Sequence, residues 1–117
     1  MLTPGSPALP ALTSEYATDP DMRDLVAEFV DAMPARALAL QVALAEQRLR
    51  DLQRLAHQLK GAAGGYGFPT LGSAAGILES TLKSPGLKSA DPAPLDRIRT
   101  QVDDLIALCS RAVAGPR

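Results

Sequence analysis

Apolar residues recur at the spacing of an α-helix in four stretches of this 117-residue chain, and this pattern limits the possible folds most strongly. Asp19-Pro20, a pair typical of a helix start, precedes the first stretch. Its apolar stripe comprises Met22, Leu25, Val26, Phe29, Met33, Leu40 and Leu44. Pro34 interrupts the stripe without changing its phase, and a proline inside a helix removes one backbone hydrogen bond. We therefore expect one bent helix or two abutting helices here.

The remaining stretches predict three further helices. The second helix should run from about Arg48 to about Gly64, and the third should begin near Pro69 with a stripe of Leu71, Ala75, Leu78 and Leu82. The last follows Asp91-Pro92 with a stripe of Leu95, Ile98, Val102, Leu105, Ile106, Cys109 and Val113. Each helix needs the others to bury its stripe. The sequence thus predicts an all-α fold, an antiparallel up-down-up-down four-helix bundle with a kinked or split first helix.

We expect the bundle to occupy residues 19–113. Residues 1–18, with three prolines, are predicted to form a flexible arm, and residues 114–117 a frayed end. Cys109 lies on an apolar stripe and is expected to pack in the core.

The composition excludes several classes of function. Twelve basic and thirteen acidic residues leave a formal net charge of −1, which does not favour nucleic acid as a partner. A single cysteine excludes an internal disulfide and, with a single histidine, the usual multi-ligand zinc site. The sequence has neither an apolar run of membrane-spanning length nor a signal-peptide pattern. We therefore expect a cytoplasmic monomer that binds no metal and no membrane.

The histidine, His57, points away from the apolar side of the second predicted helix. At about 100° per residue, the pole opposite His57 is occupied by Leu55, Leu59, Ala62 and Tyr66. The outer face around the imidazole holds Arg50, Gln53, Arg54, Lys60, Gly61 and Gly64. We therefore expect the imidazole to be exposed and bordered by cationic side chains.

An exposed neutral imidazole is a nucleophile that can attack a phosphoryl group. The ammonium group of Lys60, three residues from His57, can then screen the negative charge of that group. Arg50 and Arg54 would attract an acidic partner. A lone exposed histidine is, however, often only a solvated surface residue. The functional interpretation of His57 therefore depends on the cationic residues beside it.

The glycines after His57 divide into two groups. Gly61 lies inside the predicted helix, where glycine is unfavourable, and its missing side chain leaves the surface beside His57 open to another protein. Gly64 extends this open surface. Gly65 and Gly67 are expected to end the helix.

The segment "HQLKGAAG", residues 57–64, followed by "GYGFPTLGSAAGILE", resembles the signature of histidine phosphotransfer (HPt) domains. That signature reads His-x-x-Lys-Gly, then small residues, a glycine-rich helix end and a further helix. The resemblance covers roughly residues 20–113. It implies that His57 is the phosphoacceptor, that Lys60 stabilises the phosphate charge and that Gly61 provides steric clearance. The residues expected to contact the partner are Arg50, Gln53, Arg54, Gln58 and Gly64.

The resemblance also implies a role in a two-component phosphorelay. The phosphoryl group would pass between aspartates of response-regulator receiver domains, or come from a hybrid sensor histidine kinase. Such a phosphocarrier is not an enzyme with its own ATP site, and it needs no cofactor, because Mg²⁺ arrives with the receiver. In agreement, the sequence contains no P-loop and no kinase glycine loop.

Two alternatives remain open from the residues alone. The chain could be an HPt-like module that binds a receiver or another signalling protein without being phosphorylated. It could also be an independent enzyme, although no second histidine and no paired carboxylates accompany His57. Glu79, on the third predicted helix, flanks the site and would work against a bound phosphate. We expect it to point aside or to pair with a base such as Arg54.

Overall fold

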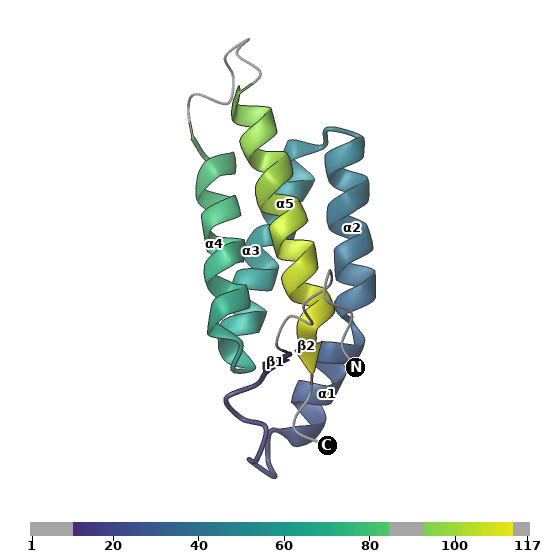
Figure 1. Ribbon diagram of the computed structural model, residues 1–117, viewed down its shortest axis with the longest axis vertical. Coiled ribbons are helices and arrows are strands. Elements are labelled where there is room, and N and C mark those ends of the chain that lie inside the picture. Colours follow the sequence, from purple (N-terminus) through teal and green to yellow (C-terminus); the bar gives the residue numbers. More distant parts are fainter. Residues whose placement is uncertain (1–10, 85–92, 114–117) are drawn as a thin grey trace, which may run out of the picture.

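A computed structural model describes residues 11–84 and 93–113, and helices dominate this part of the chain (Figure 1). The helices are α1 (Arg23–Asp31), α2 (Met33–Ala45), α3 (Leu49–Gly65), α4 (Pro69–Leu82) and α5 (Ala93–Arg111). Two short strands, β1 (Leu12–Thr13) and β2 (Ala112–Val113), pair in parallel with Leu12 opposite Ala112. The expectations for Asp91-Pro92 and for residues 1–10 and 114–117 lie outside the described residues.

The four long helices, α2 to α5, surround one aliphatic core. α3 packs against α2 and α4, and α5 packs against the same two helices, so each long helix has two long neighbours. Consecutive long helices run in opposite directions along the bundle (Figure 1). The largest fully buried side chains are Leu40, Leu52, Leu59, Leu71, Leu78, Ile98 and Leu105, with Val26 and Val102. The predicted all-α helical bundle is confirmed.

The first predicted helix is split rather than bent. α1 ends at Asp31, and α2 begins at Met33 with Pro34 in its first turn, where the missing backbone N–H breaks no helical hydrogen bond. Most of the predicted stripe faces the core, but Leu25 is 43% exposed, so its assignment to the core is wrong. No helix in residues 11–84 or 93–113 is both long and apolar enough to span a membrane.

The prediction that Asp19 caps the first helix is also wrong. α1 begins at Arg23, and its N-cap residue Met22 makes no side-chain capping bond. The carboxylate of Asp19 instead accepts a hydrogen bond from the backbone N–H of Asp21 at 2.9 Å. Asp19 therefore stabilises the turn that precedes α1.

Residues 11–18 pack against the bundle, although they were predicted to belong to a flexible arm. Ser14 is buried, and its hydroxyl donates a hydrogen bond to the carbonyl oxygen of Tyr66 at 2.5 Å. The backbone N–H of Glu15 donates to the carbonyl oxygen of Gly67 at 2.8 Å. Gly67 has a φ of +85°, and a Cβ there would lie 2.7 Å from the hydroxyl oxygen of Ser14. This segment therefore holds the turn between α3 and α4.

Cys109 packs in the core on α5, as predicted. Burial raises the pKa of its thiol to about 11, so the thiol stays protonated at neutral pH. A protonated, buried thiol packs as a small apolar side chain.

Candidate functional site

α3 turns a different face to the core than the helical wheel predicted. Its buried residues are Leu52, Ala56, Leu59 and Ala63. The centre of this face lies about 130° around the helix from His57, rather than directly opposite it. Three residues of the predicted pole are only half-buried, namely Leu55, Ala62 and Tyr66. α3 makes its most extensive packing with α4, and His57 therefore lies on the flank of α3 that borders α4.

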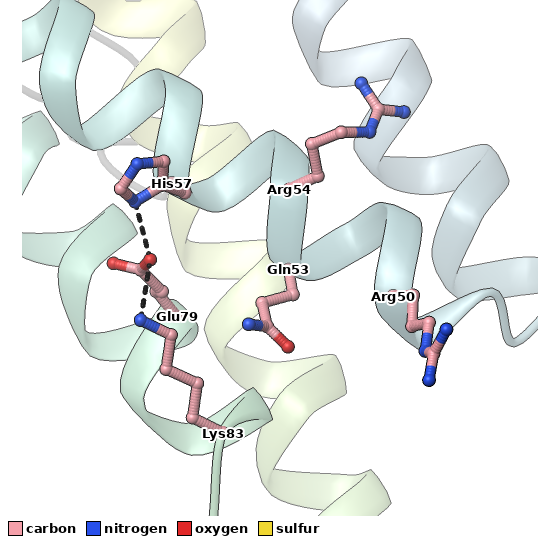
Figure 2. A pocket seen from close by; sticks show the side chains of 6 residues that line it. All are labelled: Arg50, Gln53, Arg54, His57, Glu79 and Lys83. Carbon is pink, nitrogen blue, oxygen red and sulfur yellow. Dashed lines mark hydrogen bonds and ion pairs between the residues drawn. The ribbon is translucent and has the colours of Figure 1, made fainter.

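His57 is exposed, as predicted, and it contacts a buried carboxylate on α4. The imidazole side chain is 70% exposed, whereas the side chain of Glu79 is only 6% exposed. His57 Nδ1 lies 2.7 Å from Glu79 Oε2 (Figure 2). Lys60 Nζ lies 3.5 Å from Glu79 Oε1, and Lys83 Nζ lies 3.2 Å from Glu79 Oε2. One buried acid thus joins three basic side chains, each more than half exposed.

The cations keep the Glu79 carboxylate ionised. The hydrogen bond from Lys83 has the largest effect and lowers the pKa of Glu79. Burial raises this pKa, but the hydrogen bond to His57 and the charges of both basic groups lower it again, so that it stays below 4.5. At neutral pH the carboxylate can therefore only accept hydrogen bonds.

This carboxylate selects one tautomer of the imidazole. An acceptor 2.7 Å from Nδ1 requires the ring proton to be on that nitrogen. The neutral ring then carries its lone pair on Nε2. Figure 2 shows this second nitrogen on the side of the ring away from Glu79. The geometry thus directs the lone pair of His57 away from α4.

A pocket of about 510 Å³ opens beside the imidazole. Its lining residues are Arg50, Gln53, Arg54, His57, Glu79 and Lys83 (Figure 2). It therefore brings together three of the five predicted partner-contacting residues. The other two, Gln58 and Gly64, are exposed on α3 but do not line it. Three cationic side chains around the opening suit an anionic group. Within residues 11–84 and 93–113, no cluster of three or more His, Cys, Asp or Glu side chains could hold a metal ion.

Comparison with protein families matches residues 24–108 to the Hpt domain. The chain belongs to the Hpt domain family. The match extends from α1 into α5 and includes the whole site between α3 and α4. Hpt domains are phosphocarrier modules that take part in histidine phosphotransfer in two-component signalling. Comparison with curated proteins and with solved structures gave no match.

In this Hpt domain Glu79 pairs with basic side chains, as one of the two alternatives expected, but Arg54 is not among them. Arg54 Nη2 instead lies 3.8 Å from Asp51 Oδ1, one turn earlier on its own helix. Glu79 faces α3 because α3 and α4 pack along most of their length, which places its carboxylate under the imidazole. Sequence reasoning also missed Lys83, although its spacing of four residues from Glu79 on one helix is a recognisable signal for an ion pair.

The glycines of the Hpt domain separate into those the fold requires and those it does not. A Cβ at Gly61, Gly64 or Gly65 would meet no atom within 4 Å. Gly65 is still the last residue of α3, whereas Gly67 carries the positive φ that ends the helix and turns the chain. The packing of the chain therefore offers no reason for glycine at position 61, beside His57.

Proposed function

We propose that this Hpt domain is a phosphocarrier that accepts a phosphoryl group on His57 from a receiver-domain aspartate, or from a hybrid sensor kinase, and passes it to another receiver. The hydrogen bond between Nδ1 of the exposed imidazole and the buried, ionised Glu79 is the observation that supports this proposal most strongly. It leaves the Nε2 lone pair directed away from α4, where an incoming domain can reach it.

The transfer step needs no proton to leave the ring. Nε2 attacks the phosphorus of an aspartyl phosphate, the N–P bond forms, and the P–O bond to the aspartate breaks. The aspartate leaves as a carboxylate with the electron pair of that bond. The imidazole ring becomes positively charged, and its Nδ1–H stays bonded to Glu79, whose negative charge stabilises the ring. Mg²⁺ for the reaction comes with the receiver, and the Hpt domain supplies no cofactor.

Lys60 is the group proposed to stabilise the transferred phosphoryl group. Its ammonium has three donors, and at 3.5 Å it makes the longest of the three contacts to Glu79. The side chain is 55% exposed, so it can turn one donor toward a phosphoryl group on Nε2. Gly61 keeps the surface beside the ring bare. Arg50, Gln53 and Arg54 line the pocket where the partner would contact α3.

The test is the variant His57→Gln with a phosphorylated receiver domain as donor. The wild-type chain should gain an acid-labile, alkali-stable phosphate, and the variant should gain none. Because the side chain is 70% exposed, circular dichroism should show an unchanged fold. Labelling of the variant would refute the assignment of His57. Receiver binding without any phosphohistidine in the wild type would instead identify an interaction module.

A further inference from the structure

Gly76 lies in the middle of α4, where glycine is less favourable than any other residue except proline. No positive φ requires a glycine at this position. A Cβ at Gly76 would instead meet a single side chain of the neighbouring helix, with Lys60 Cδ at 3.5 Å, Cε at 3.7 Å and Cγ at 3.9 Å. The aliphatic stem of Lys60 therefore lies across the bare backbone of α4 at Gly76.

The side of α4 that faces α3 links this contact to the phosphotransfer site. Gly72, Gly76 and Glu79 are four and three residues apart, so they lie on one side of the helix. A Cβ at Gly72 would lie 3.5 Å from the carbonyl oxygen of Lys60, and Glu79 contacts the imidazole of His57. The three residues thus follow Lys60 from its backbone, along its stem, to the carboxylate under the ring.

The stem of Lys60 ends at the same carboxylate that holds His57. Lys60 Nζ lies 3.5 Å from Glu79 Oε1, and His57 Nδ1 lies 2.7 Å from Glu79 Oε2. The Lys60 side chain remains 55% exposed although its stem contacts α4. A stem that is already guided by a neighbouring helix loses less conformational entropy when its ammonium turns to a phosphoryl group than a side chain that is free in solvent.

We propose that Gly76 is a positioning residue for phosphoryl transfer, because it leaves open the surface of α4 along which Lys60 reaches the carboxylate beside His57. This proposal rests on the proposed function, in which Lys60 stabilises the transferred phosphoryl group. An alanine methyl at position 76 would touch the stem at ordinary contact distances of 3.5 to 3.9 Å, so Lys60 could stay in place. Valine adds two further carbons to that Cβ, and its χ1 angle is nearly fixed in a helix, so the stem would have to leave α4.

The variant Gly76→Val tests this role, with Gly76→Ala as the conservative substitution and Ser73→Val as the matched control. Ser73 is exposed on the same helix, so its variant introduces valine into α4 at the surface. The donor is a receiver domain that phosphorylates the wild-type chain, itself phosphorylated with acetyl phosphate and Mg²⁺. Gly76→Val should slow transfer about tenfold, the loss expected when one hydrogen bond to a charged group is removed. Gly76→Ala and Ser73→Val should stay within about twofold of the wild-type rate.

A Lys60→Ala background separates positioning of the lysine from damage to the fold. Without the stem, valine at position 76 has nothing to displace, so the double variant should transfer as fast as Lys60→Ala alone. Phosphoramidate, from which the imidazole displaces ammonia, should show the same losses, because Lys60 acts on the phosphoryl group and not on docking. Circular dichroism checks the fold, and if Gly76→Val does not fold, Gly76→Ser, which adds one atom beyond Cβ, replaces it with the same expectations.

The outcomes distinguish this proposal from the proposed function. A wild-type rate for Gly76→Val, or an equal loss in the Lys60→Ala background, would overturn the role of Gly76 and leave the proposed function standing. A wild-type rate for Lys60→Ala would also overturn it, because Gly76 would then position no functional group. The same holds for a loss seen with the receiver but not with phosphoramidate, since docking would then be affected. A wild-type chain that no receiver phosphorylates on His57 would refute the proposed function itself.

Discussion

Replacing Glu79 by glutamine should remove the negative charge beside His57 while the imidazole keeps its tautomer. The carboxylate offers one oxygen to His57 at 2.7 Å and to Lys83 at 3.2 Å, and the other oxygen to Lys60 at 3.5 Å. Glutamine keeps one acceptor oxygen, and its NH₂ group only donates. From the position of Oε2 that oxygen serves both His57 and Lys83, so the NH₂ group turns toward Lys60, whose contact is the longest. Nδ1 then keeps its proton, and the lone pair stays on Nε2.

The substitution removes one contribution to transfer. The ring of the Glu79→Gln variant keeps its orientation but loses the negative charge that balances it during transfer. A hydrogen bond to a charged group is worth about 1.5–3 kcal/mol, so we expect the transfer rate to fall by about 10- to 100-fold. The fold should persist, because both lysine side chains are more than half exposed and can be hydrated.

The rate is measured by transfer from a phosphorylated receiver, and the tautomer by ¹⁵N NMR of the imidazole. Asp51→Asn is the matched control, because it makes the same chemical change in a carboxylate on the same surface. Asp51 contacts Arg54 at 3.8 Å and Arg48 at 4.0 Å, not the imidazole, so its variant should transfer normally. A Glu79→Gln variant that keeps the wild-type transfer rate, or one whose ring proton moves to Nε2, would refute the reasoning.

Three further predictions follow from the geometry. Gly61→Ala should stabilise the protein by about 1 kcal/mol in thermal unfolding, because its Cβ meets open space, and yet it should slow transfer from a receiver. The control variant Gly65→Ala, whose Cβ also meets open space, should transfer at the wild-type rate. An undiminished transfer rate for Gly61→Ala would exclude a clearance role for Gly61. Gly67→Ala should lose about 2–3 kcal/mol in urea unfolding, from the positive φ and the displaced Ser14 hydrogen bond; an unchanged midpoint would contradict this. Because the pKa of Glu79 is lowered on folding, its ionisation stabilises the fold above pH 4.5, and this contribution is lost as the pH falls through the lower folded value. Acid unfolding curves of Glu79→Gln should therefore depend less steeply on pH than wild-type curves over that range.

The helices and the exposure of His57 could be predicted because both depend on local spacing. The break near Pro34 follows from one residue, and the apolar period of α4 places its stripe correctly in the core. The contact of His57 with Glu79 joins residues 22 apart and depends on how far α3 is rotated toward α4. The helical wheel predicted that the core-facing side of α3 lies directly opposite His57, which is about 50° around the helix from the buried face in the structure. The pattern of one helix alone cannot predict this rotation, because it depends on how α3 packs against α4.

The packing of residues 11–18 was missed for a related reason. The prolines near the start of the chain favoured a flexible arm. The composition of a short segment does not show which distant residues it contacts in the folded chain. The hydroxyl of Ser14 meets Tyr66 only because the end of α3 and the start of α4 come together in the folded chain. Contacts of this kind belong to the tertiary structure and not to local propensity.

The position of Glu79 under an exposed ring has a consequence for how the phosphorylated state is recognised. A phosphoryl group on Nε2 needs no buried side chain to move, because His57, Lys60 and Lys83 all lie at the surface above a rigid aliphatic core. The loaded and unloaded forms should thus share one backbone. Under the proposed function, the domain is a phosphocarrier rather than a conformational switch, and a partner distinguishes the two forms by binding the phosphoryl group itself.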